Sequence, residues 1–134
     1  MIAIDTNMLV RFFVESDIDI VEHKIAAAFI ENNTDLFVPR SVLLEFEWVL
    51  RGVYKKNRQD AHEILSGLLN IANVTVENEG MAHEAMRHYQ AGLDFADSMH
   101  LAASAHCEKL ATLDQKFAKG AQRLGLKPPC IVPG

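Results

Sequence analysis

Residues 1–13 read MIAIDTNMLVRFF, and in them a short apolar run ends on Asp5, Thr6 and Asn7 before apolar residues resume. The apolar run 2–4 predicts a short buried strand, and the apolar spacing in 7–14 predicts a helix with Asn7 as its cap. Asp5 therefore follows directly on a strand. It either caps the next helix or lies at the carboxyl end of a parallel strand, where open α/β sheets bind ligands.

Short apolar runs alternate with amphipathic segments along the chain. Strands are expected at 2–4, 35–39, 73–77, 109–114 and 130–132, and helices at 7–14, 19–32, 41–54, 58–72, 79–92, 94–107 and 115–125. This order predicts an α/β protein with a mostly parallel sheet. Because the chain has 134 residues and no internal repeat, we expect a single domain over 1–134.

The composition is that of an ordinary globular protein, with 49% hydrophobic and 23% charged residues. No apolar run approaches the ~20 residues of a membrane span, and no secretory signal is evident, so no membrane association is expected. The cysteines, Cys107 and Cys130, form no CxxC pair, which indicates free thiols and a cytoplasmic location.

The charge is unevenly distributed along the chain. The net charge of −5 argues against a general nucleic-acid coat protein. Residues 1–50 carry nine acidic and three basic side chains, whereas 107–134 carry two acidic and five basic ones. The sequence therefore leaves open an enzyme that acts on nucleic acid.

A second acid, Asp114, stands in the same context as Asp5. It ends the stretch LATLD (110–114), so both acids follow an apolar strand, and helix capping is the alternative for each. Glu45 has no base within one turn of its helix and borders an apolar face. An acid in that position either is exposed or needs a partner or a metal ion.

Asp97 is the fourth candidate acid. Asp94 is expected to cap the helix that follows, with Asp97 in its first turn, which is an ordinary place for an acid. The first turn of a helix packed on a sheet also lies near the strand ends. We therefore expect Asp97 to lie at the same edge of the sheet as Asp5 and Asp114.

Four carboxylates that meet without bases repel one another. A pair ~5 Å apart at an effective dielectric of ~20 costs roughly 3 kcal/mol, so such a cluster needs protons or a cation. Oxygen-only ligands favour Mg²⁺ or Mn²⁺, which activate water for phosphoryl displacement. Nearby hydroxyl and amide groups that would orient the ligands belong to Thr6, Asn7, Ser98 and Thr112.

Four stretches together resemble a known family. IDTNMLVRFF (4–13), VPRSVLLEFEWVL (38–50), DFADSMHLAAS (94–104) and LATLDQKF (110–117) occur in the order and spacing of a PIN domain, and are more closely similar to the VapC-type toxins of bacterial toxin–antitoxin pairs. The resemblance covers nearly the whole chain. It implies a three-layer α/β/α fold with a mostly parallel sheet of four or five strands, and a Mg²⁺-dependent endoribonuclease.

The same resemblance implies roles for individual residues. Asp5, Glu45 and Asp97 match the family's acids, Asp5 and Asp97 match its usual metal ligands, and Asp114 matches a less uniform fourth acid. It also implies an RNA substrate cut to leave 5′-phosphate and 3′-hydroxyl ends. The implied partners are a second copy of the chain in a homodimer and a small cognate antitoxin protein.

Basic residues follow Asp114 closely. Lys116, Lys119 and Arg123 fall at i, i+3 and i+7, which predicts a basic stripe that contacts RNA phosphates. The alternative is a basic helix end that suits the helix dipole. A large aromatic residue outside this region, Trp48, is expected in the core or in a dimer interface.

Other functions remain open for these residues. A PIN-like module without catalytic activity would bind metal or a protein partner. A phosphatase would use Asp5 as a nucleophile, but the acid expected two residues later is replaced by Asn7. A receiver-like regulator would need adjacent acids in the first motif, which IDTN (4–7) lacks.

Overall fold

The computed structural model describes residues 1–134 and divides into two compact units, Met1–Glu79 and Gly80–Gly134. We call them the N-terminal unit and the C-terminal unit, and each is described by itself. No helix combines the length and the apolar character needed to span a bilayer.

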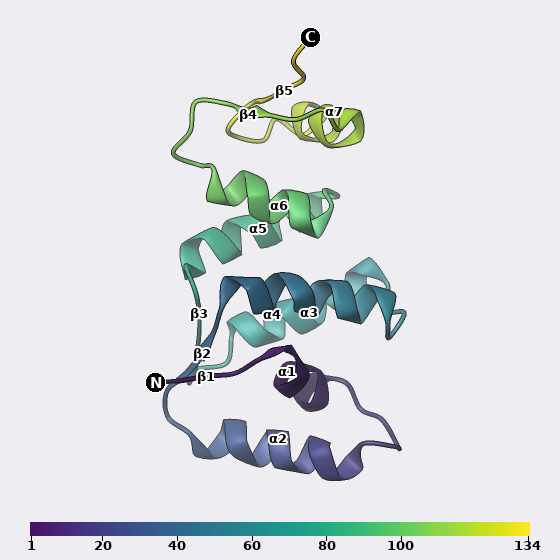
Figure 1. The fold of residues 1–134 in the computed structure, drawn as a ribbon, viewed down its shortest axis with the longest axis vertical. Helices are drawn as coiled ribbons and strands as arrows, with labels where there is room; N and C mark the ends of the chain where they lie inside the picture. The colour runs from purple at the N-terminus through teal and green to yellow at the C-terminus, as the bar shows by residue number, and fades with distance from the viewer. The chain divides into compact units, whose positions relative to one another are not determined.

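The N-terminal unit contains three strands and four helices (Figure 1). In chain order these are β1 (Ile2–Ala3), α1 (Thr6–Phe13), α2 (Ile20–Asn32), β2 (Leu36–Val38), α3 (Arg40–Gly52), α4 (Arg58–Leu69) and β3 (Val74–Val76). The strands form one parallel sheet in the order β1-β2-β3. Helix α1 contacts both α2 and α3, which brings the segment after β1 beside α3.

Alternation along the strands builds the core of this unit. Leu36 and Val38 are fully buried on β2, and Val74 and Val76 are buried on β3, while Thr75 between them is exposed. Helix α3 adds buried residues at helical spacing, namely Leu43, Phe46 and Leu50. The opposite face of α3 is thereby left toward the surface, and Glu45 lies on it.

The C-terminal unit contains α5 (Glu79–Ala91), α6 (Phe95–Ala103), β4 (Leu110–Ala111), α7 (Gln115–Arg123) and β5 (Cys130–Ile131). Strands β4 and β5 pair in parallel, and α7 contacts β5. Gly92 ends α5 at a φ of +119°, a backbone conformation that favours glycine. One hydrophobic core cluster of the unit consists of Leu93, Leu101, Phe117, Ala118, Ala121 and Cys130.

The predicted α/β class is confirmed, and every strand is parallel to its neighbour. All the predicted strands and helices are present, with bounds that differ by a few residues; α1 and α3 each begin one residue earlier than expected, and α6, expected to reach residue 107, ends at Ala103. The five strands form a three-stranded sheet in the N-terminal unit and a two-stranded sheet in the C-terminal unit.

Three local expectations change. The predicted burial of residues 2–4 holds only for Ile4, because Ile2 and Ala3 are exposed. The predicted cap of α1 was wrong, and of the two places expected for Trp48 the core is excluded, while the dimer interface stays a prediction. Asn7 does not cap α1; the helix begins at Thr6, and the Asp5 side chain accepts the hydrogen bond from the Met8 backbone N–H. Trp48 is 66% exposed and does not belong to the core, because α3 buries the face that carries Phe46 instead. The cap of α1 bears on the candidate site, because Asp5 lines its pocket.

Candidate active site

Asp5 lies at the start of α1, immediately after the first strand. Its Oδ1 accepts a hydrogen bond from the Met8 backbone N–H at 3.1 Å, and its own backbone is extended, as an N-cap requires. The second carboxylate oxygen takes no part in this cap. Asp5 therefore caps the helix and still presents an exposed carboxylate oxygen, so the two interpretations of this acid are compatible.

Glu45 is held by a residue adjacent to Asp5 in sequence. The Thr6 hydroxyl donates a short hydrogen bond to Oε1 of Glu45 and links α1 to α3 across 39 positions of sequence. Thr6 is buried, at 8% exposure, whereas Glu45 is exposed. The bond fixes one oxygen of Glu45 and places its carboxylate beside Asp5 and Asn7 in a single pocket.

This pocket has a volume of about 350 Å³ and runs between α1 and α3. Its lining includes the polar residues Asp5, Thr6, Asn7 and Glu45. Val10, Val49 and Val53 supply apolar walls, and Arg11 and Tyr54 complete the lining. Thr6 and Asn7 of the first motif thus line the same pocket as Asp5 and Glu45.

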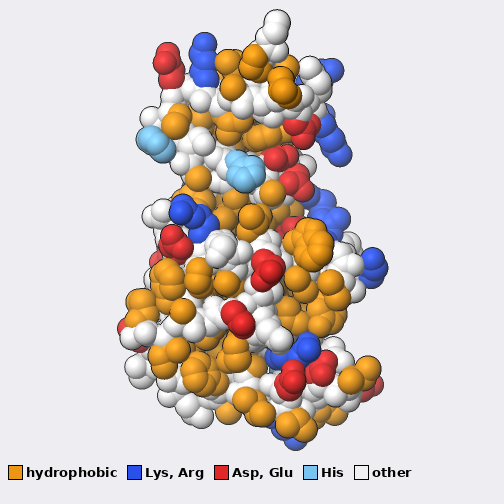
Figure 2. Space-filling model, in the orientation of Figure 1, with side chains coloured by type: hydrophobic (Ala, Val, Ile, Leu, Met, Phe, Trp, Pro, Cys, Tyr) orange, Lys and Arg blue, Asp and Glu red, His pale blue; other side chains and the backbone are white.

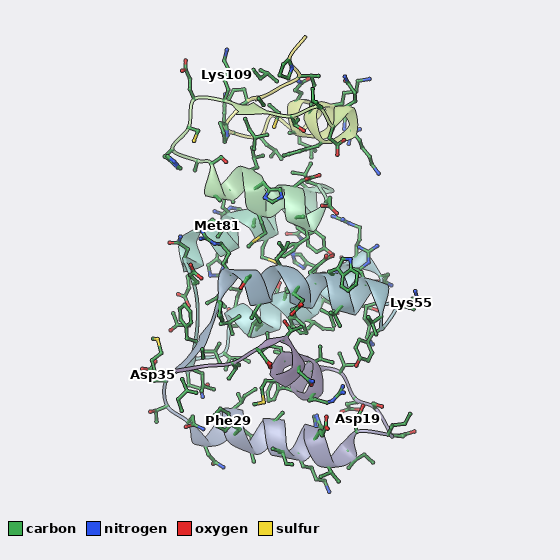
Figure 3. All side chains as sticks on the ribbon, viewed as in Figure 1. Asp19, Phe29, Asp35, Lys55, Met81 and Lys109 are labelled. Atoms are coloured by element: carbon green, nitrogen blue, oxygen red, sulfur yellow. The ribbon has the colours of Figure 1, made fainter.

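Arg11 is the one basic residue in the lining of this pocket, and it pairs with acids that do not line the pocket. Its Nε donates to Glu22 at 2.6 Å, its Nη1 donates to the Tyr54 hydroxyl at 3.1 Å, and Asp19 lies 3.5 Å away. Figure 3 labels Asp19 next to the start of α2. The Glu22 and Tyr54 hydrogen bonds hold the pKa of Arg11 above its ordinary value.

Sequence reasoning missed Arg11 and Tyr54. The signal was present for Arg11, because it stands four residues after Asn7 and so shares its helix face. Tyr54 lies just beyond α3, and its position beside Arg11 depends on how α1 and α3 pack. The two residues are 43 positions apart, so the local spacing of side chains cannot predict their contact.

The C-terminal unit brings a second group of acids together. Asp94 Oδ2 accepts the Asp97 backbone N–H at 3.3 Å and caps α6, as predicted. Asp114 Oδ1 accepts the Phe117 backbone N–H at 3.1 Å and caps α7. The three acids line one cavity of about 560 Å³, and Asp97 and Asp114 also line a second of about 430 Å³.

The basic stripe of α7 faces the same larger cavity. Lys116, Lys119 and Arg123 all belong to its lining. None of the three forms an ion pair with Asp94, Asp97 or Asp114 in the structure. The cavity therefore has an acidic wall and a separate basic wall, an arrangement suited to a ligand that carries both a metal ion and phosphates.

The electrostatics of the C-terminal unit centre on Asp97. Its pKa is raised, mainly because the half-buried carboxylate is desolvated, and further because Asp94 and Asp114 are negative; His100 acts in the opposite direction. Burial also raises the pKa of the Cys130 thiol, with a smaller contribution from Asp97. Asp97 is thus a carboxylate whose charge lacks compensation from the protein.

The hydroxyl groups of this unit support the backbone of the acids. Thr112 Oγ1 accepts the Asp114 backbone N–H at 3.0 Å. Ser98 is fully buried, and its hydroxyl donates to the Asp94 backbone carbonyl at 2.8 Å. Both side chains therefore fix the position of a capping acid through its main chain and form no hydrogen bond with its carboxylate.

Each unit offers oxygen donors of the kind that hard divalent cations prefer. The candidate ligands Asp5 and Asp97 offer carboxylate oxygens, and neither acid is in an ion pair with a lysine or an arginine. Within either unit no three acidic, histidine or cysteine side chains lie close enough to hold an ion by themselves. Mg²⁺ suits such a site, because it keeps several waters and binds one or two carboxylates.

The structure thus brings together Asp5 with Glu45, and Asp97 with Asp114. The convergence of the two pairs on one site stays a prediction. Among known families, the model of the PIN domain matches residues 2–122 of the chain, a range that includes all four acids. A search of curated proteins finds no match.

Proposed function

The chain belongs to the PIN domain family, whose members are generally nucleases, and on this premise we propose that it is a Mg²⁺-dependent endoribonuclease. The observation that carries the proposal is the set of carboxylates without basic partners. Asp5 and Glu45 share one pocket, and Asp97 and Asp114 share another cavity, where burial first, and then the negative charges of Asp94 and Asp114, raise the pKa of Asp97.

Each acid has a role in this reaction. Asp5 and Asp97 would hold the metal through carboxylate oxygens, with Mn²⁺ as a possible substitute. When bound, the ion supplies Lewis acidity and lowers the pKa of a water molecule. Because Thr6 bonds to Oε1 of Glu45, Oε2 is left to accept a hydrogen from the attacking water. Asp114 has the same capacity through Oδ2, since Oδ1 caps α7.

The basic wall of the larger cavity supplies the RNA contacts of this proposal. Lys116, Lys119 and Arg123 would bind backbone phosphates on either side of the cleaved bond. Such contacts do not read sequence, so they position the strand and leave the choice of RNA to other groups.

The proposed biological role is that of the toxin of a type II toxin–antitoxin system, with a small antitoxin protein as inhibitor and a homodimer as the working form. The support is the resemblance of the four motifs to VapC-type toxins. Induced expression should stop growth, and co-expression of a short reading frame from just upstream of the gene should restore it. Light scattering on the purified protein should report the mass of a dimer.

RNA cleavage by the purified protein tests the enzymatic proposal. We expect structured RNA to be cut with Mg²⁺, not with chelator, and the cuts to disappear in Asp5→Asn and in Asp97→Asn. Equal cleavage by the native protein and Asp97→Asn would contradict the proposal. Mg²⁺ binding without cleavage would identify a PIN module that is not catalytic, and a trapped phosphoryl group on Asp5 would identify a phosphatase.

A further inference from the structure

The turn between α3 and α4 is the basic part of an otherwise acidic unit. Residues 51–58 read RGVYKKNR and carry four basic side chains and no acidic one. The rest of the N-terminal unit carries thirteen acidic and three basic side chains. We call residues 51–58 the basic turn, and its bases are Arg51, Lys55, Lys56 and Arg58. The proposed reaction assigns no role to any of them.

Two of these bases have no acidic partner. Nη1 of Arg51 lies 3.8 Å from Oε2 of Glu47, one turn earlier on α3. Lys55 and Lys56, by contrast, form no ion pair and no side-chain hydrogen bond. Lys55 is exposed, and Lys56 is half-buried. A phosphate can therefore pair with both ammonium groups without displacing an acid of the protein.

Lys55 has a backbone conformation that favours glycine. Its φ is +55°, in the left-handed region that residues with a side chain rarely adopt. The end of α3 requires a sharp change of direction here, because the Lys56 N–H donates to the Leu50 carbonyl at 2.9 Å. A glycine would relieve the strain, and a lysine stands there instead. Strained positions are concentrated at functional sites, so this lysine is a candidate for a functional contact.

The basic turn adjoins the pocket that contains Glu45. Tyr54, directly before Lys55, lines that pocket. Helix α3 ends at Gly52, seven residues beyond Glu45 and about 10 Å farther along the helix axis. A nucleic-acid strand advances about 3.4 Å per nucleotide, so this end of α3 lies roughly three nucleotides from Glu45. Figure 3 labels Lys55 beyond this end of α3, and in Figure 2 a basic side chain projects there from the surface.

Helix dipoles explain only part of the basic turn. A base in the last turn of a helix interacts favourably with the helix dipole, which accounts for Arg51 on α3. Lys56 and Arg58 lie just before α4 and at its first residue, where the dipole favours acids over bases. The stability of α3 and α4 therefore does not account for all the positive charge gathered here.

We propose that the basic turn binds the RNA backbone beside the pocket of Glu45, through Lys55 and Lys56. The inference rests on the proposed nuclease function. Ammonium groups bind phosphates through charge and read no base, so the contact holds the strand regardless of its sequence. The basic turn acts in addition to the basic stripe of α7. A strand that ended within about three nucleotides of Glu45 would miss the contact and bind more weakly.

The test is the salt dependence of RNA binding to the full chain in chelator, where no cleavage occurs. The probe is a fluorescent RNA oligonucleotide. We expect Lys55→Ala to reduce the slope of log K against log salt by about 1, and the double variant with Lys56→Ala to reduce it by about 2. Lys24→Ala is the matched control, because Lys24 is an exposed base of the same unit, on α2, and forms no ion pair. Its slope should equal that of the native protein.

A glycine at position 55 separates the side chain from the backbone. Lys55→Gly removes the charge and also relieves the strain, so it should keep or raise the melting temperature while it reduces the salt slope. Asn78→Gly is the control, because Asn78 is the other residue with a side chain and a positive φ, +54°, and carries no charge. It should bind RNA like the native protein. Lys55→Arg keeps the charge and should keep the slope.

Other outcomes would overturn the inference. A native salt slope in Lys55→Gly and in the double variant would mean that these lysines do not contact RNA, and so would equal slopes in Lys55→Ala and Lys24→Ala. Unchanged RNA binding with weaker binding of polyglutamate would identify a surface for an acidic protein instead. A reduced slope without Mg²⁺-dependent cleavage by the native protein would contradict only the nuclease function, whereas cleavage with unchanged slopes would contradict only the role of the basic turn.

Discussion

The Thr6 hydroxyl donates its hydrogen to the Glu45 carboxylate, and this bond joins the helix after the first strand to the helix after the second. Thr6 follows Asp5 directly, so the cap of α1 and the position of Glu45 depend on the same turn of backbone. The first turn of α1 therefore positions both candidate acids of the N-terminal unit, Asp5 and Glu45.

Replacing Thr6 by valine should impair cleavage more than stability. Valine fills the same volume but removes the hydroxyl, which leaves Glu45 free to rotate away. Loss of a group that orients a metal or catalytic ligand typically costs about 10- to 100-fold in activity or metal affinity. Cleavage rates with Mg²⁺ titration would measure the loss, and Thr6→Ser, which keeps the donor, should retain most activity. Full activity in Thr6→Val would mean that the bond has no role in the reaction.

The two functions of Asp5 should separate by substitution. Asparagine caps helices about as well as aspartate but lacks the charge, so Asp5→Asn should keep the melting temperature and abolish cleavage. Asp5→Ala should abolish cleavage and also lose about 1 kcal/mol of stability. Thermal unfolding and RNA cleavage of both variants would show the separation.

Asn57 provides the matched control for the capping effect. Its side chain caps α4 by accepting the Asp60 backbone N–H at 2.8 Å, away from the lining of the pocket. Asn57→Ala should lower stability by a similar amount and leave cleavage unchanged. If Asp5→Asn still cleaved RNA while Asp5→Ala were less stable, Asp5 would have only a structural role as a helix cap.

Asp97 should make the metal-free protein less stable as the pH rises. Because its pKa is raised in the folded state, the folded protein binds more protons than the unfolded chain between the two pKa values. The stabilising contribution is present below the unfolded pKa and is lost as the pH rises through the folded pKa. Asp97→Asn should therefore raise the melting temperature at neutral pH in chelator and flatten this part of the pH profile.

Added Mg²⁺ distinguishes a metal ligand at position 97 from a purely structural acid. The ion should stabilise the native protein more than Asp97→Asn, since ligand binding to the folded state raises its stability. Lower stability of Asp97→Asn both with and without Mg²⁺ would point to a structural role in the first turn of α6.

Lys119 should contribute to RNA binding through charge alone. Removing one phosphate contact with Lys119→Ala should weaken binding of every RNA similarly and reduce the slope of log K against log salt by about 1. Lys109→Ala is the comparison, because Lys109 is exposed in the same unit and does not line the cavity. A salt slope equal in the two variants would exclude the basic stripe from the RNA-binding surface.

Local patterns in the sequence determined the elements of this protein. Hydrophobic periodicity located every strand and helix, because side chains repeat every two residues on a strand and every 3.6 on a helix. The spacing between Asp94 and Asp97 predicted the cap of α6, because a capping side chain reaches the N–H three residues later. These relations span only a few residues, so they can be predicted from the sequence alone.

Tertiary packing decided what the site is made of. The Thr6–Glu45 and Arg11–Tyr54 contacts join residues that are 39 and 43 positions apart in sequence. Helix α3 buries Leu43, Phe46 and Leu50, so Trp48 on another face of the helix is exposed. Which face of a helix is buried depends on the elements packed against it. For that reason the candidate acids could be found in the sequence, while the partners that orient them could be found only in the folded chain.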